Sequence, residues 1–118
     1  MTRRLRVLVV EDEMIVSMML VDMLGDLGHE VVGTATRLDE ALRLAATAEM
    51  DLAMLDLNLA GQQTYPVAEA LRARGLRFVF ATGYGEDGLP DAWRGTPTLQ
   101  KPFLMHDLEQ ALAQASTG

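Results

Sequence analysis

The sequence predicts an α/β fold in which the strands of a parallel sheet alternate with crossover helices. Short apolar runs rich in β-branched residues alternate with longer segments of helical period, and five such cycles follow one another. The first run, Leu5 to Val10, shows no polar alternation after Arg6, which is typical of a strand buried on both faces. The 118 residues are enough for one domain of this kind and too few for two.

The first half of the chain is predicted to contain two strands and two helices. After the strand from Leu5 to Val10, a helix from Glu13 to Leu27 is expected, with Gly28 just beyond its end. Its apolar residues share one stripe: Val16, Leu20, Met23, Leu24 and Leu27. Glu30 to Ala35 is the second strand. Thr36 is expected to cap a second helix, whose apolar residues recur at helical spacing: Leu38, Ala41, Leu42 and Ala45.

The third strand, Asp51 to Asp56, is predicted to end on a carboxylate. A turn at Gly61 follows it. Thr64 is then expected to cap the third helix, which has a proline in its first turn and Gly75 at its end.

The last part of the chain carries weaker signals around its fourth helix. Arg77 to Thr82 is the fourth strand. Three glycines and a proline between residues 83 and 90 predict that the fourth helix is short, from Asp91 to Arg94. Thr98 to Gln100 is a brief fifth strand. An amphipathic last helix follows, with its apolar face formed by Leu104, Leu108, Ala111, Leu112 and Ala115.

Composition narrows the class of protein. Hydrophobic residues make up 49% of the chain and charged residues 23%, which is typical of a globular domain. The net charge of −7 disfavours binding to nucleic acid or to anionic membranes, because both attract clustered Lys and Arg. The chain has no cysteine, which excludes disulfides, cysteine metal sites and thiol catalysis. It shows no signal-peptide core and no membrane span, so a cytoplasmic location is expected.

Polar side chains follow four of the five predicted strands. Glu11 and Asp12 come after the first strand, Asp56 ends the third, Thr82 ends the fourth, and Lys101 follows the fifth. Ligands of open parallel sheets bind beyond the carboxyl ends of the strands. These side chains are therefore expected to converge at one edge of the sheet.

The three carboxylates predict a magnesium site, because Glu11, Asp12 and Asp56 would repel one another without a cation. Oxygen ligands suit Mg²⁺, which commonly binds one or two carboxylates together with substrate phosphate. Asp56 could then act as a nucleophile toward a phosphoryl group. Lys101 and the Thr82 hydroxyl would help to neutralise the phosphoryl oxygens.

Taken singly, each of these residues has a simpler interpretation. Asp12 could cap the first helix, Thr82 could belong to a turn, and Lys101 could be a surface lysine. The joint pattern, in order along an alternating α/β chain, favours a phosphoryl-transfer site.

This pattern resembles the receiver domain of bacterial two-component response regulators. The resemblance covers nearly the whole chain and is carried by Val7 to Glu13, Leu55 to Leu59 and Lys101 to Phe103. It implies a flavodoxin-like, doubly wound sheet of five parallel strands in the order 2-1-3-4-5, here with a short or irregular fourth helix. It also implies that residues 1–118 form one receiver domain with no output domain, or a receiver excised from a hybrid kinase.

The resemblance assigns roles to the residues at the strand ends. Asp56 would accept a phosphoryl group from a histidine kinase or a histidine phosphotransfer protein. Mg²⁺ would be bound by Asp12, Asp56 and the main-chain carbonyl of Asn58, while Glu11 would act through a coordinated water. Thr82 would move onto the phosphoryl group, and Lys101, placed by a cis bond to Pro102, would pair with it.

The sequence departs from the usual receiver at Thr98, where a Tyr or Phe switch residue generally stands. The stretch from Phe80 to Gly85 instead resembles an alphaproteobacterial subfamily with a Phe-Ala-Thr-Gly motif, whose members stand alone or are attached to kinases of the HWE type. One hypothesis is that the glycine-rich loop moves and that Tyr84 is its aromatic. The alternative is that Tyr84 simply packs over the loop.

Other residues have less specific interpretations. Met14, Met18 and Met19 are interpreted as core-filling residues; a contact for a helix of a kinase or phosphotransfer protein is the alternative. Trp93 is expected to cover the short fourth helix. Both histidines, His29 and His106, are interpreted as surface residues.

The function predicted from the sequence is that of a signalling phosphoacceptor that acts through protein partners, with no catalysis beyond its own phosphorylation and dephosphorylation. A Mg²⁺-dependent small-molecule phosphatase of the haloacid-dehalogenase type is a rival. In such enzymes an acid stands two residues after the nucleophile, whereas Asn58 stands there in this chain. A binding scaffold that is never phosphorylated is a third possibility, but such scaffolds normally lack the Asp or the Lys.

Overall fold

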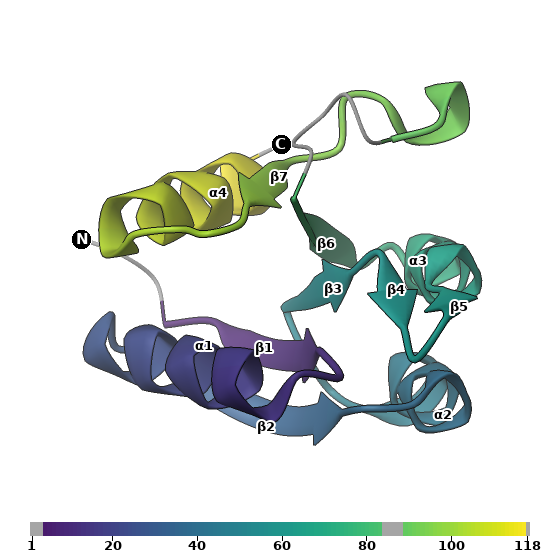
Figure 1. The fold of residues 1–118 in the computed structure, drawn as a ribbon, viewed down its shortest axis with the longest axis horizontal. Coiled ribbons are helices and arrows are strands. Elements are labelled where there is room, and N and C mark those ends of the chain that lie inside the picture. The colour runs from purple at the N-terminus through teal and green to yellow at the C-terminus, as the bar shows by residue number, and fades with distance from the viewer. Residues whose placement is uncertain (1–3, 84–88, 118) are drawn as a thin grey trace.

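The computed structural model describes residues 4–83 and 89–117. Its centre is one parallel sheet of five strands in the order β2-β1-β3-β6-β7. These strands are β1 (Arg6–Val10), β2 (Glu30–Ala35), β3 (Leu52–Asp56), β6 (Arg77–Thr82) and β7 (Thr98–Gln100). Every neighbouring pair is parallel. The order is the predicted 2-1-3-4-5, so the predicted flavodoxin-like sheet is confirmed (Figure 1).

Helices cover both faces of the sheet. On one side lie α1 (Met14–Asp26) and α4 (Met105–Thr117), and on the other lie α2 (Leu38–Thr47) and α3 (Tyr65–Ala73) (Figure 1). None of the helices in the described part of the chain has the length and apolar character needed to cross a bilayer.

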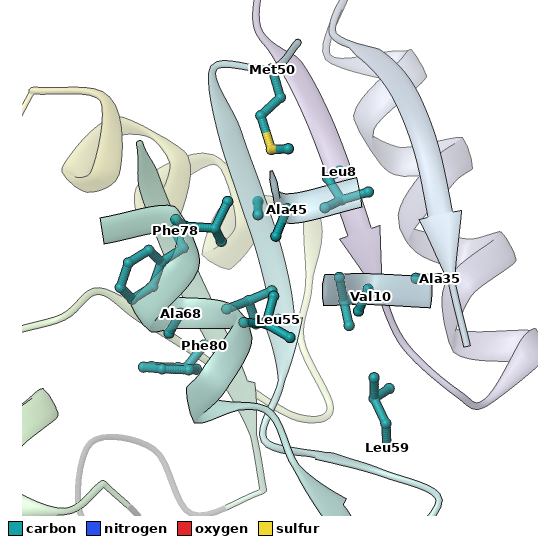
Figure 2. Packing of buried hydrophobic residues seen from close by; sticks show 14 of the residues in the cluster. Leu8, Val10, Ala35, Ala45, Met50, Leu55, Leu59, Ala68, Phe78 and Phe80 are labelled. Carbon is teal, nitrogen blue, oxygen red and sulfur yellow. The ribbon is translucent and has the colours of Figure 1, made fainter. Parts of the chain in front are cut away.

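Two hydrophobic clusters join these layers, and β1 contributes to both. Val7 and Val9 pack toward α1 and α4, whereas Leu8 and Val10 pack toward α2 and α3. Figure 2 shows the cluster on the α2 and α3 side of the sheet, where Leu8 and Val10 lie beside side chains from α2, α3, β3 and β6. Because successive strand residues point to opposite faces, a strand covered on both faces is apolar throughout.

A short hairpin that the sequence analysis did not predict follows β3. Its strands are β4 (Asn58–Leu59) and β5 (Gln62–Gln63), which pair antiparallel. The two residues between them, Ala60 and Gly61, both have positive φ, at 49° and 86°. Positive φ at both central positions is typical of a type I′ turn, so the predicted Gly61 turn closes a hairpin.

The predicted helix caps differ in detail from the structure. The residue before α2 is Arg37, and the main-chain N–H of Thr36 donates to Oε1 of Glu40 at 3.1 Å. Thr64 does precede α3, as predicted, but its hydroxyl donates to the main-chain carbonyl of Asp56 and makes no cap hydrogen bond.

The short fourth helix is a single 3₁₀ turn, η2 (Asp91–Trp93), and Trp93 anchors it to the sheet. The indole is only 5% exposed, and its ring lies 5.9 Å from the rings of Tyr65, Phe78 and Phe80. The Arg72 guanidinium lies 4.2 Å from the centroid of the same ring. Trp93 is therefore part of the core, where it fills space beside α3.

One histidine was assigned to the surface wrongly. His29 is 8% exposed, and its Nδ1 accepts a hydrogen bond from the main-chain N–H of Leu5 at 3.0 Å. Burial lowers the pKa of His29 below its ordinary value. His106 is exposed, as expected.

Candidate functional site

The predicted site residues meet at the carboxyl edge of the sheet. The order of the strands places β1 beside β3 and β3 beside β6, so Glu11, Asp56 and Thr82 occupy neighbouring strand ends. The main-chain N–H of Lys101 donates to the carbonyl of Thr82 at 2.9 Å, which brings the lysine to the same edge. The Lys101–Pro102 peptide bond is cis, as the resemblance implied.

Three carboxylates form the acidic part of the site. Glu11, Asp12 and Asp56 each offer an oxygen, and the three oxygens lie within 4.8 Å of one another. Glu11 is 2% exposed and Asp12 is exposed, while the Asp56 side chain is 15% exposed. Such an all-oxygen set is suited to a hard divalent cation such as Mg²⁺.

Lys101 supplies the positive charge that faces these acids. Its Nζ lies 2.8 Å from Oε1 of Glu11 and 3.3 Å from Oδ2 of Asp56. Burial alone would lower the pKa of Lys101, but the hydrogen bond to Glu11 and the charge of Asp56 outweigh it and raise that pKa. The ammonium is therefore charged and bridges the side chains of Glu11 and Asp56.

Glu11 carries the most perturbed titration of the site. Burial raises its pKa to about 8, the neighbouring Asp56 adds to the rise, and Lys101 opposes it. Its Oε2 atom is buried and has no hydrogen-bond partner among the described residues. An unpaired buried oxygen is costly. The water shell of a bound cation would provide a partner, so these residues fit a magnesium site.

Hydrogen bonds fix the loop around Asp56. Its Oδ1 accepts from the main-chain N–H of Leu57 at 2.9 Å, and its carbonyl accepts from the hydroxyl of Thr64. Oδ2 of Asp12 accepts from the main-chain N–H of Ala60 at 2.9 Å, which ties the hairpin to the end of β1. The sequence did not predict this role of Thr64. A threonine before a helix indicates a helix cap, and nothing in the sequence indicates a hydrogen-bond partner as distant as Asp56.

The remaining predicted residues differ in how far the structure describes them. Thr82 is 3% exposed at the end of β6. Asn58 begins β4, two residues beyond Asp56, and is exposed. Tyr84, the aromatic of the proposed mobile loop, lies outside the described residues. Thr98 begins β7, at the position where the resemblance implied an aromatic switch residue.

A model of one protein family matches nearly the whole chain. The family is described as the response regulator receiver domain, and the match covers residues 7–113. The chain belongs to this family. Receiver domains are signalling modules of two-component systems that interact with histidine kinases or phosphotransfer proteins.

Several known receivers are similar to this chain. The transcriptional regulatory protein PdtaR of Mycobacterium tuberculosis is 31% identical over 114 residues, which cover 93% of this chain and 56% of PdtaR. The chain spans about half the length of the curated relatives that it matches.

Solved structures of alphaproteobacterial receivers share its fold. SdrG from Sphingomonas melonis Fr1 is 43% identical, with a TM-score of 0.86 and 98% of both chains covered. PhyR from Brucella abortus is 31% identical, with a TM-score of 0.83 over 96% of this chain and 48% of PhyR. These neighbours agree with the subfamily that the Phe-Ala-Thr-Gly motif indicated.

Proposed function

We propose that Asp56 of this receiver accepts a phosphoryl group from a phosphohistidine, in a reaction that depends on Mg²⁺. The observation that supports this role is the convergence of Asp56 with Glu11, Asp12 and Lys101 at the ends of the strands. The Asp56 side chain is 15% exposed, so a phosphoryl donor can reach it. A buried ion pair without that access would favour a purely structural role.

In the proposed transfer, an oxygen of Asp56 attacks phosphorus. A P–O bond forms, the P–N bond to the donor histidine breaks, and its electron pair returns to the imidazole. Lys101, already 3.3 Å from Oδ2 of Asp56, would balance negative charge on the phosphoryl oxygens, and the Thr82 hydroxyl would donate to one of them.

Four residues would hold Mg²⁺: Asp12 and Asp56 through carboxylates, Asn58 through its main-chain carbonyl, and Glu11 through water. The bound ion would supply positive charge that offsets the negative charge of the phosphoryl oxygens. Water later attacks phosphorus, the P–O bond to Asp56 breaks, and inorganic phosphate and the free carboxylate of Asp56 are released. In this proposal the chain acts on its own Asp56 and has no separate substrate. Asn58 stands where a phosphatase of the haloacid-dehalogenase type has its general acid, and an amide cannot serve as one.

Acetyl phosphate provides the direct test. Incubating the protein with acetyl phosphate and Mg²⁺ should add one phosphoryl group, located at Asp56 by mass spectrometry of the fragments. Removing Mg²⁺ with a chelator, or Asp56→Ala, should abolish the modification. Asp26→Ala, which removes an exposed carboxylate at the end of α1, should leave it intact. Equal modification of Asp56→Ala would refute the proposal.

The exposed face of α1 supports a helical docking partner. Met14, Ile15, Met18 and Met19 are between 40% and 83% exposed, so the core-filling interpretation of the three methionines was wrong. A cavity of about 430 Å³ lies beside Met14 and Met18, between α1 and the end of β2. We infer that a helix of a histidine kinase, for example of the HWE type, or of a phosphotransfer protein packs here, in the cytoplasm.

The role of this α1 surface in docking can be tested separately from the phosphoryl chemistry at Asp56. Ile15→Ser should slow phosphoryl transfer from a phosphorylated kinase or phosphotransfer protein by about tenfold or more, while phosphorylation by acetyl phosphate keeps its rate. Leu104→Ser, at another exposed apolar residue, is a comparison variant. If Ile15→Ser leaves both rates unchanged, the partner docks elsewhere.

A further inference from the structure

Among the residues that the structure describes, β7 is the last strand of the sheet and has a neighbour, β6, on one side only. The N–H of Lys101 points to β6, where it donates to the carbonyl of Thr82. Main-chain groups of successive strand residues point to opposite sides. The N–H and C=O groups of Thr98 and Gln100 therefore face the open edge, where another strand could pair with them.

A continuous groove follows this edge. It consists of two cavities, of about 660 Å³ and 450 Å³, and Thr98 and Gln114 line both of them. The larger lies at the beginning of β6 and β7, and the smaller lies between β7 and α4. We call the two together the edge groove. A groove beside open main-chain groups is the geometry in which an extended peptide adds a strand to a sheet.

Two arginines line the larger cavity of the edge groove. Arg77 begins β6, and the Arg72 guanidinium is oriented by its contact with Trp93. Neither makes an ion pair with a carboxylate elsewhere in the described chain, although acidic residues outnumber basic ones by 17 to 10. Most other basic side chains of the described residues do pair with an acid. The arginine end of the groove is thus complementary to a carboxylate of another molecule.

We propose that an extended segment of a partner protein binds in the edge groove, adds a strand to β7 and places an Asp or Glu side chain between Arg72 and Arg77. The open main chain selects an extended peptide, and the two guanidiniums select its carboxylate. Asp107 and Lys101 line the opposite end of the groove, where the Lys101 ammonium is paired with Glu11 and Asp56, so an acid is favoured at the arginine end. The inference does not depend on phosphorylation of Asp56.

The test uses the unphosphorylated full chain and a defined probe, the peptide acetyl-Glu-Val-Thr-Val-Thr-Val-amide. In an NMR titration, the amides of Thr98 and Gln100 should shift and exchange more slowly with solvent. The side-chain Nε signals of Arg72 and Arg77 should shift as well. The same peptide with Lys in place of Glu should bind about tenfold more weakly or worse.

Three variants separate the contributions. Arg77→Gln should weaken binding of the Glu peptide about tenfold, and Arg43→Gln, at an exposed arginine on α2, should not. Thr98→Pro removes an N–H that faces the open edge and keeps the hydrogen bonds to β6, so it should abolish binding while the thermal unfolding curve shows a folded protein.

Four outcomes would overturn the inference. The first is the absence of shifts at millimolar peptide, and the second is equal binding of the Glu and Lys peptides. The third is an equal shift of the two arginine signals with free glutamate and no protection of Thr98, which would indicate a site for small anions. The fourth is protection of Thr98 that grows with protein concentration in the absence of peptide, which would indicate a second copy of the chain.

Discussion

Glu11 is the residue whose contribution to folding stability depends most on whether the site binds a proton or a cation. Its pKa is raised in the folded protein, so the native state holds a proton that the unfolded chain has released. The stability that this proton contributes is complete below the ordinary value of 4.5 and is lost as the pH rises toward about 8. A divalent cation would replace the proton and remove this loss.

Glu11→Gln should therefore flatten the pH dependence of the metal-free protein. The free energy of unfolding of the wild type should carry a component that decreases from pH 5 to pH 8, and the variant should lack it. At pH 8 the variant should be more stable by on the order of 1 kcal/mol. Urea unfolding in a chelator measures the difference, and Glu69→Gln, at an exposed site, should resemble the wild type.

His29 produces the opposite slope at lower pH. Its folded pKa is lowered, so its contribution is complete above 6.5 and is lost as the pH falls below that value. Protonation of Nδ1 would remove the acceptor for the N–H of Leu5. His29→Asn keeps an acceptor at a similar position and does not titrate. It should lose less stability than the wild type between pH 6.5 and pH 5, whereas His106→Asn should change nothing.

At the scale of elements, η2 stands in the place of the fourth helix and is held mainly by one side chain. A single turn of three residues buries little surface, yet Trp93 contacts an aromatic group of three rings and one guanidinium. The aromatic contacts connect η2 to β6 and to the first residue of α3. Most of what holds η2 in place is therefore the burial of one indole.

Trp93→Ala should lower the free energy of unfolding by about 3–5 kcal/mol, because it leaves a cavity beside Phe78 and Phe80. Trp93→Phe should lose less, since it keeps part of the ring contacts. Arg72→Ala should cost about 0.5–1 kcal/mol through the lost cation–π contact. Chemical denaturation monitored by circular dichroism gives all three values. A small loss for Trp93→Ala would mean that η2 is held by other contacts.

Three strands of the main sheet, β1, β3 and β6, could be predicted because each is a mostly buried, apolar run. The strands β2 and β7 at the two edges are only partly buried. The β4–β5 hairpin could not be predicted, because a strand of two residues has no period and Gln62 and Gln63 are polar. The burial of Trp93 was also unpredictable, since no periodic neighbours surround it. His29 was misassigned because its burial depends on Leu5, which is distant in sequence.

The site was more predictable than the loops, and the reason is geometric. In a parallel sheet the ends of the strands meet, so acids after the first and third strands converge once the order of the strands is known. The hydrogen bonds around Asp56 could not be predicted in this way. Thr64 could have capped α3, and only the folded loop brings its hydroxyl to the carbonyl of Asp56.

For the whole molecule, the net charge of −7 and the acidic site predict stabilisation by Mg²⁺. A ligand at ten times its dissociation constant stabilises the native state by about 1.4 kcal/mol. The midpoint of thermal unfolding should therefore rise with added Mg²⁺. Asp12→Asn should reduce this rise, and Asp39→Asn, at an exposed residue on α2, should not. An equal rise in KCl of matched ionic strength would show general screening of charge instead.

Lys101 is the only lysine of the chain. Reagents that react with amines thus have one side-chain target, and that target lies between Glu11 and Asp56. Reductive methylation with isotope-labelled formaldehyde would place a single side-chain probe inside the site. Its chemical shift would follow the occupancy of the site directly, in a mixture or in a cell extract, with every other side chain of the chain unlabelled.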